Sequence, residues 1–315
     1  MIEARGLTKR YGEKVAVDDL TFDVKPGTVT GFLGPNGAGK STTMRMIVGL
    51  DAPTSGSVTV DGKPYSDLAK PMQAVGALLE ARAVHTSRSA YNHLRALAAT
   101  HGISRTRVDE VIEMVGLQEV ARKRAGGFSL GMGQRLGIAS ALLADPTTLI
   151  LDEPVNGLDP EGIRWIRGLL RQLAAEGRTV FVSSHLMSEM ALTAEHVIVI
   201  GRGRLMADMA MADLIAQAST NVVTVRTPQA SELAAALAGP DVTVSGSGHD
   251  LLEVTGLNAP QIGQHARDLG IVLHELTPQQ ASLEEAFMEM TRNEIEYHAH
   301  PIGAGEADDS SRSLA

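Results

Sequence analysis

The sequence contains no cysteine, and only 3% of its 315 residues are aromatic. Without cysteine, the chain can form no disulfide, no thiolate metal site and no cysteine nucleophile. Because aromatic side chains are scarce, the core must be built mainly from aliphatic residues, and a hydrophobic content of 43% is enough for a sizeable core. The length predicts two domains, or one large domain with an extension.

Long apolar runs and a basic excess are also missing. The longest apolar runs, such as HVIVIG, fall far short of the roughly 18 to 20 residues that span a bilayer. The first residues, MIEARGLTKRYG, contain charges and glycines, so no signal peptide is expected. The net charge of −9 argues against a protein whose main task is to bind nucleic acid. We therefore expect no transmembrane segment and no nucleic-acid partner.

Short β-branched runs alternate with helical stretches as far as about residue 217. Several runs are apolar throughout, as expected of strands that are buried on both faces of a sheet. This alternation predicts an α/β domain with a largely parallel sheet, and residues 88–144 are interpreted as a helical insertion. The predicted strands are residues 29–34, 56–60, 148–152, 178–184 and 196–201, and the predicted helices are residues 40–49, 160–175 and 186–194.

The segment after Ser219 has a different pattern, with the predicted order β-α-β-β-α-β. That order is typical of a ferredoxin-like α+β unit. SGSGHD (245–250) supplies turn residues for its middle hairpin, and an amphipathic helix, SLEEAFMEMT (282–291), follows its last strand. We expect a nucleotide-binding domain over residues 1–217, with a helical subdomain at about 84–146. An accessory α+β domain over 220–291 and a disordered tail over 292–315 are expected to follow.

The stretch GFLGPNGAGKST (31–42) fits the pattern G-x-x-x-x-G-K-[ST] of a phosphate-binding loop. Its glycines let backbone N–H groups approach the phosphates, and the positive end of the following helix adds to the attraction. Lys40 can reach the β- and γ-phosphates, and Ser41 offers a hydroxyl to Mg²⁺. The predicted nucleotide-binding residues of this loop are Gly34, Pro35, Asn36, Gly37, Ala38, Gly39, Lys40, Ser41 and Thr42.

A second element, LILDEP (149–154), ends an apolar strand in two carboxylates. Asp152 can hold Mg²⁺, usually through water. Glu153 can orient or deprotonate the attacking water. Together with the phosphate loop, these residues predict a P-loop ATPase or GTPase, and they leave open which branch of that class it is.

The stretch FSLGMGQRLGIA (128–139) decides between the branches. It resembles the signature of the ATP-binding cassette (ABC) ATPases, which is LSGGQ, or LSGGMQQR in a longer form. With Gln134 as the reference position, Ser129 and Gly131 match the signature serine and second glycine. Leu130 replaces the first glycine. The resemblance implies that Ser129 and Gly131 contact the γ-phosphate, and that residues 1 to about 217 form a P-loop ABC ATPase domain.

Further residues are assigned by the same resemblance. GLDP (157–160) is similar to the D-loop of the family, with Asp159 in its acidic position. His185 in VSSHL resembles the histidine that contacts the γ-phosphate from the end of a strand. Tyr11 resembles the aromatic residue that stacks on adenine.

One position departs from the family pattern. The family places a glutamine, a ligand of Mg²⁺ and water, after a strand that precedes the helical insertion. The matching stretch here is VGALLEAR (75–82), which places Glu80 in that position as a charged metal ligand. Glutamate variants resemble exporter ATPases of the bacitracin and lantibiotic type, and the C-terminal extension resembles that of the daunorubicin-resistance type.

In this family two cassettes face head to tail, and the resemblance therefore implies a homodimer that closes over ATP. The leading hypothesis is the ATP-hydrolysing subunit of a membrane exporter of drug, antibiotic or peptide-like substrates, with separate permease chains, at the cytoplasmic face of the membrane. The alternative is a soluble ABC ATPase that acts on DNA or ribosomes. Ser129 follows Lys40 by 89 positions, and this interval contains no sustained heptads, unlike that of genome-maintenance relatives. Ribosome-acting relatives carry two cassettes in one chain, and this chain carries one. A non-catalytic binding cassette is a third hypothesis, and the retention of Lys40, Asp152, Glu153 and His185 argues against it.

Overall fold

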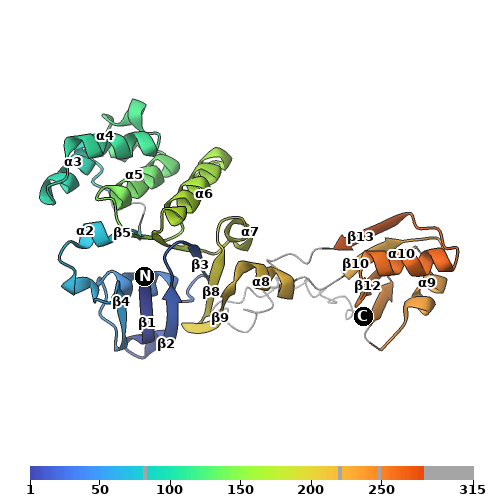
Figure 1. The fold of residues 1–315 in the computed structure, drawn as a ribbon. Helices are drawn as coiled ribbons and strands as arrows, with labels where there is room; N and C mark the ends of the chain where they lie inside the picture. The colour runs from blue at the N-terminus through green and yellow to red at the C-terminus, as the bar shows by residue number, and fades with distance from the viewer. Residues whose placement is uncertain (81–83, 219–221, 241, 247–249, 280–315) are drawn as a thin grey trace, which may run out of the picture.

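Figure 1 shows a computed structural model of the chain. The structure describes residues 1–80, 84–218, 222–240, 242–246 and 250–279. The helix predicted over 282–291 and the tail predicted over 292–315 lie outside these residues. In the described part, no helix is both long enough and apolar enough to span a bilayer.

The centre of residues 1–218 is a six-stranded sheet. Its strands, in their order across the sheet, are β5 (Val75–Leu78), β6 (Thr148–Leu151), β7 (Thr179–Ser184), β3 (Val29–Leu33), β8 (His196–Gly201) and β9 (Arg204–Ala210). All neighbours pair in parallel except β8 and β9, which pair antiparallel. Every residue of β3, β6 and β7 is buried, which explains their apolar sequences. The predicted, largely parallel sheet is confirmed.

A second sheet consists of three antiparallel strands, which are, in order, β2 (Lys14–Val24), β1 (Ile2–Tyr11) and β4 (Ser55–Val60). The strand predicted at residues 56–60 is confirmed as β4, but it belongs to this antiparallel sheet and not to the largely parallel one. Only one residue of β4 is buried, as suits a strand with a solvated face. The sequence pattern missed β1 and β2, because irregularities in their pairing interrupt the period-two alternation of apolar residues.

The two sheets of this region share an aromatic contact. Phe22 of β2, Phe32 of β3 and Phe181 of β7 have ring centroids 5.0 to 5.9 Å apart. All three side chains are almost fully buried. Three of the five phenylalanines therefore lie in one cluster, which packs the antiparallel strands against the six-stranded sheet.

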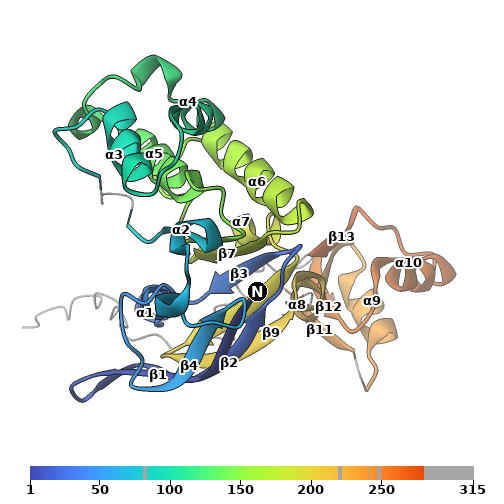
Figure 2. The same cartoon turned by 60° about the vertical axis from the view of Figure 1, so that its left-hand side comes forward.

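Helices surround the six-stranded sheet. They are α1 (Lys40–Ile47), α2 (Pro71–Ala74), α3 (Ala90–Thr100), α4 (Arg105–Met114), α5 (Leu130–Leu142), α6 (Pro160–Ala175), α7 (Met187–Ala191) and α8 (Met211–Ala218). α3, α4 and α5 fall within the predicted helical insertion and lie beside one another, away from the small antiparallel sheet (Figure 2). Each begins after a serine whose side chain accepts a hydrogen bond from a backbone N–H, namely Ser89, Ser104 and Ser129.

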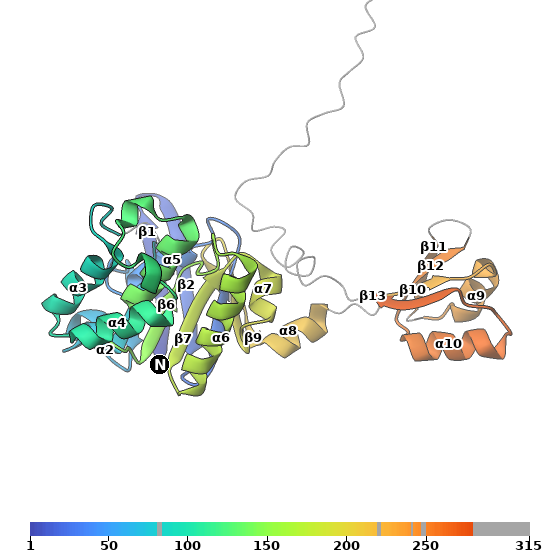
Figure 3. The same cartoon turned by 90° about the horizontal axis from the view of Figure 1, so that it is seen from above.

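Residues 222–279 fold around a four-stranded antiparallel sheet. Its strands, in order, are β11 (Thr243–Gly246), β12 (Leu251–Thr255), β10 (Val222–Arg226) and β13 (Glu275–Gln279). Its helices are α9 (Ala230–Leu237) and α10 (Ala259–Asp268). Alternate residues of β10 and β12 join one apolar cluster with both helices, which lie next to the strands in Figure 3.

Candidate nucleotide site

The predicted phosphate loop lies between β3 and α1, as its mechanism requires. Gly37 and Gly39 have φ angles of 83° and 103°, which side chains other than glycine rarely adopt. A Cβ atom at Gly34 would lie 2.5 Å from the carbonyl oxygen of Ile200, and one at Gly39 would lie 2.6 Å from that of Ala16. Glycine is therefore required at both positions, where the loop packs tightly against its neighbours.

Lys40 lies under this loop. Its Nζ atom donates to the carbonyl oxygens of Gly34 at 2.6 Å and Pro35 at 3.2 Å, and it lies 3.9 Å from a Glu153 carboxylate oxygen. Burial lowers the pKa of Lys40, and the negative charges of Glu153 and Asp152 offset this effect only in part. The buried ammonium is thus incompletely neutralised and can gain from the arrival of negative phosphates.

Asp152 follows the last residue of β6 and is held from two sides. Ser41 donates a hydrogen bond of 2.6 Å to Asp152 Oδ2, and Ser183 donates to Oδ1. The backbone N–H of Asp152 donates to the carbonyl oxygen of Leu78 on β5. The first residues of α1 and the carboxyl ends of β5, β6 and β7 therefore meet at this carboxylate, whose oxygens are of the kind that Mg²⁺ prefers.

Glu153 and His185 lie next to each other. The sequence analysis assigns Glu153 to the attacking water and His185 to the γ-phosphate, which are roles at the same reaction centre. His185 Nδ1 lies 2.8 Å from Glu153 Oε2, so its N–H can donate to the carboxylate. The Glu153 backbone has a φ of 50°, an uncommon value for a residue with a side chain. Two contacts hold this turn: the Glu153 N–H donates to Ser183 Oγ, and Gln134 Nε2 donates to the Glu153 carbonyl oxygen.

Tyr11 lies at the end of β1, and its side chain is 49% exposed. Its hydroxyl donates to Asp51 at 2.9 Å, and Lys9 Nζ lies 5.0 Å from the ring centroid. Partial burial and, next, the hydrogen bond to Asp51 raise the pKa of Tyr11, so the phenol stays protonated. An exposed, anchored ring of this kind is suited to stacking on a base.

Glu80 follows β5 by two residues and is exposed. It lines a hollow of about 590 Å³ together with Ser41 and Arg45 of α1. Among the described residues, no group of three carboxylate or imidazole side chains forms a metal cage. A Mg²⁺ ion at this site would consequently depend on phosphate oxygens and water as further ligands.

The segments that resemble the signature and the D-loop contact each other. Ser129 caps α5, and Asp159 caps α6 by accepting from the Gly162 N–H at 2.8 Å. A Cβ atom at Gly157 would lie only 2.4 Å from atoms of the Leu130 side chain. The leucine that replaces the first signature glycine therefore lies on the glycine of the D-loop.

Not all predicted site residues meet within one chain. Ser41, Lys40, Asp152, Glu153 and His185 form one connected group. In the part of the chain that the structure describes, no hydrogen bond or ion pair links Ser129, Gly131 or Asp159 to the phosphate loop. The sequence analysis missed Ser183 and Gln134, which hold Asp152 and Glu153. Ser183 carried a signal, because it is one of two serines that follow the apolar run VFV at the end of a fully buried strand.

Comparison with known proteins identifies the family. The family profile described as ABC transporter matches residues 17–156. The "Uncharacterized ABC transporter ATP-binding protein YhcH" of Bacillus subtilis (strain 168) is 38% identical over 295 residues, which cover 92% of this chain and 96% of that protein. The chain belongs to the ABC transporter ATP-binding proteins. Residues 221–284 match a second profile, a domain of unknown function, DUF8746.

Two further similarities refine this assignment. "Bacitracin transport ATP-binding protein BcrA" of Bacillus licheniformis is 45% identical over 212 residues, 66% of this chain and 69% of that protein. This relative confirms the resemblance to exporter ATPases of the bacitracin type. A dimeric structure of an ATP-binding cassette in a post-hydrolysis state, bound to ADP and Pi, is 26% identical, with a TM-score of 0.62, and covers 67% of this chain and 99% of its own. The P-loop ABC fold, ATP binding and ATPase activity are thus those of the family.

Proposed function

We propose that this chain is the ATP-hydrolysing subunit of a membrane exporter for antibiotic or peptide-like molecules. It works with separate permease chains at the cytoplasmic face of the membrane. The observation that carries the proposal is the connected group at the carboxyl edge of the sheet, in which Ser41 and Ser183 hold Asp152 while His185 contacts Glu153. The similarity to a bacitracin transport ATP-binding protein supports the substrate class.

In the proposed reaction, the loop glycines and Lys40 bind the β- and γ-phosphates of ATP, and Tyr11 stacks on adenine. Glu153 accepts a proton from the attacking water, and His185 contacts the γ-phosphate while its ring orients the Glu153 carboxylate. The incompletely neutralised ammonium of Lys40 stabilises the negative charge on the phosphates.

The residues at this site also fit Mg²⁺. Ser41 offers a hydroxyl oxygen, Asp152 a carboxylate, and Glu80 a second carboxylate in the same hollow. Oxygen donors beside a phosphate loop suit this ion, which keeps several waters and binds through one or two carboxylates plus phosphates. When bound, Mg²⁺ would neutralise charge between the β- and γ-phosphates.

ATP binding is proposed to join two copies of the chain head to tail. Ser129, Gly131 and Asp159 lie on loops that do not contact the phosphate loop of their own chain, so each would act on ATP held by the partner. The dimeric cassette structure with ADP and Pi supports this arrangement.

We also propose that residues 220–291 form a separate accessory domain with a ferredoxin-like fold, next to a nucleotide-binding domain over residues 1–217. The element order β-α-β-β-α-β and the strand order β11-β12-β10-β13 support this assignment. A chain that ends at Ser219 should retain ATP binding, because every nucleotide motif lies upstream.

Reconstitution of the chain with a permease distinguishes the export function from the alternative, in which the chain acts on DNA or ribosomes. The full chain is purified with a candidate permease, which is sought in the reading frames beside its gene, and both are placed in vesicles. We expect the permease to retain the chain on the vesicles and an antibiotic or peptide substrate to raise its ATPase rate. Lys40→Ala is the matched control, which should bind the permease without hydrolysing ATP. An ATPase rate that responds to ribosomes or DNA, and not to the permease, would favour the alternative.

A further inference from the structure

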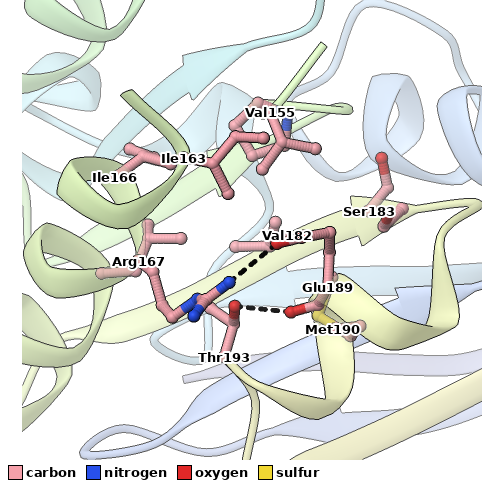
Figure 4. Close-up of a pocket in the computed structure, with 12 residues that line it drawn as sticks. Val155, Ile163, Ile166, Arg167, Val182, Ser183, Glu189, Met190 and Thr193 are labelled. Carbon is pink, nitrogen blue, oxygen red and sulfur yellow. Dashed lines mark hydrogen bonds and ion pairs between the residues drawn. The ribbon is translucent and has the colours of Figure 1, made fainter. Parts of the chain in front are cut away.

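An ion pair joins the two helices that follow the catalytic motifs. α6 begins directly after Asp159, and α7 begins two residues after His185. Arg167 of α6 places its Nη2 atom 2.9 Å from Oε2 of Glu189 on α7. Figure 4 shows this pair at the pocket between α6, β7 and α7. The pair therefore connects the D-loop side of the site to the side that carries the histidine.

Both members of the pair are largely removed from water. The Arg167 side chain is 23% exposed, and that of Glu189 is 28% exposed. Arg167 Nε is buried and has no hydrogen-bond partner among the described residues. Glu189 is the anionic group that contacts this guanidinium in the described part of the chain. The loss of either partner would leave a charge poorly compensated in a site of limited water access.

Two further hydrogen bonds stabilise the C-terminal end of α7. Thr193 Oγ1 donates to the Glu189 carbonyl oxygen at 2.8 Å, and Arg171 Nη2 donates to the Leu192 carbonyl oxygen at 2.6 Å. The helix has only five residues, and its first residue, Met187, is buried. Because so short a helix moves largely as one piece, its position is transmitted to the residues immediately before it.

Apolar packing between α6 and β7 is incomplete at this place. A gap of about 10 Å³ remains there, lined by the ion pair itself and by apolar side chains that include Val155, Ile166 and Val182 (Figure 4). Atoms that line such a gap lose dispersion contacts on one side. Met187 and Met190 pack α7 into the apolar core, and the ion pair adds a polar restraint between α7 and α6 beside this gap.

We propose that Arg167 is a positioning residue that acts through Glu189 and α7 to keep His185 in contact with Glu153. The inference rests on the proposed function, because it assumes that His185 and Glu153 act on ATP. It adds a coupling between α6 and the histidine, so that a movement of the D-loop alters the geometry at the water-activating carboxylate.

The test compares full-length variants of this pair. Arg167→Met keeps most of the apolar stem and removes the charge, and Glu189→Gln removes the opposite charge. Arg167→Lys restores a cation for the one Nη contact, and Arg164→Met is a matched control at an exposed position of the same helix. Steady-state ATPase rates, equilibrium binding of a non-hydrolysable ATP analogue and thermal unfolding are measured for each.

We expect kcat to fall roughly tenfold or more in Arg167→Met and Glu189→Gln, as for a catalytic group displaced by a fraction of an ångström. Analogue binding should stay within about twofold of wild type, because the phosphate loop is untouched. Arg167→Lys should recover most of kcat, and Arg164→Met should equal wild type.

Two results would overturn the inference alone: a wild-type kcat in Arg167→Met, or a joint loss of kcat, analogue binding and thermal stability that Arg167→Lys does not recover. An active Lys40→Ala or Glu153→Gln protein would overturn the proposed function itself, and the inference with it. The two failures are therefore distinguishable in one set of assays.

Discussion

Ser41 donates a hydrogen bond of 2.6 Å to Asp152, which joins the first turn of α1 to the end of β6 across 111 positions of sequence. Ser183 holds the other oxygen of the same carboxylate. An aspartate held on both oxygens is preorganised, so the Mg²⁺ ion of the proposed site would need little rearrangement of the protein to bind there.

Asp152→Asn should lower the ATPase rate by on the order of 10²-fold at saturating Mg²⁺, because it removes the charge that faces the metal. Ser183→Ala should have a smaller effect, since it leaves the charge and frees one oxygen. Steady-state rates over a Mg²⁺ titration measure both. Equal losses in the two variants would mean that the orientation of Asp152 matters as much as its charge.

The burial of Lys40 predicts a particular pH dependence of stability. Its pKa is lowered in the folded chain, mainly by burial, so the unfolded chain binds the proton more tightly. Between the folded pKa and the ordinary value of 10.5, stability therefore rises with pH. We expect the free energy of unfolding of wild type, relative to Lys40→Met, to increase from pH 7 toward pH 10 in urea titrations without nucleotide. A difference that falls over this range would contradict the assignment.

Gly157 should not tolerate a side chain. Its φ is 77°, and a Cβ atom would lie 2.4 Å from the Leu130 side chain. Gly157→Ala should cost about 1–3 kcal/mol of stability from backbone strain and weaken ATP-driven dimerisation by displacing the signature loop. Leu130→Gly in the same chain should restore part of the dimerisation.

A matched control for this change lies nearby. Gly168 sits in the interior of α6, and a Cβ atom there would meet no heavy atom within 4 Å. Gly168→Ala should raise stability by about 0.5–1 kcal/mol. If Gly157→Ala behaved like this control, Leu130 and Gly157 would not be packed as described.

Glu80 provides a test of metal binding at the hollow beside α1. Glu80→Gln replaces a charged ligand with a neutral one of similar shape. We expect a higher Mg²⁺ requirement for hydrolysis, with catalysis retained at saturating metal, because the negative site depends on the cation to accept negative phosphates. Mg²⁺ titrations of both proteins that superimpose would show that Glu80 is not at the metal.

The sequence predicted those parts of the site that are contiguous in the chain. The phosphate loop has a fixed spacing of glycine, lysine and serine, and the carboxylates at 152 and 153 end a fully apolar strand. Four strands of the six-stranded sheet, β3, β6, β7 and β8, followed from such apolar runs, whereas β9 was not predicted. Such local patterns are visible because one short segment supplies both the structure and the chemistry.

Contacts between distant segments could not be predicted in this way. Ser183 meets Asp152 only because β7 lies next to β6, and Leu130 meets Gly157 only because α5 begins beside the D-loop. The misplacement of residues 56–60 has a related cause, since a short β-branched run does not reveal which of two sheets it will join. Tertiary packing decides which strands pair, and this packing cannot be derived from a single sequence.

The central claim is that Glu153 activates water at an ATP site that two chains complete together. Light scattering of the purified Glu153→Gln protein, with and without ATP, tests it most directly. The control is the double variant Glu153→Gln/Lys40→Ala, which should not bind the phosphates of ATP. The account predicts that Glu153→Gln binds ATP, hydrolyses none of it, and is a dimer with ATP and a monomer without it, whereas the double variant stays monomeric. A Glu153→Gln protein that hydrolyses ATP at the wild-type rate, or remains monomeric with ATP bound, would contradict it.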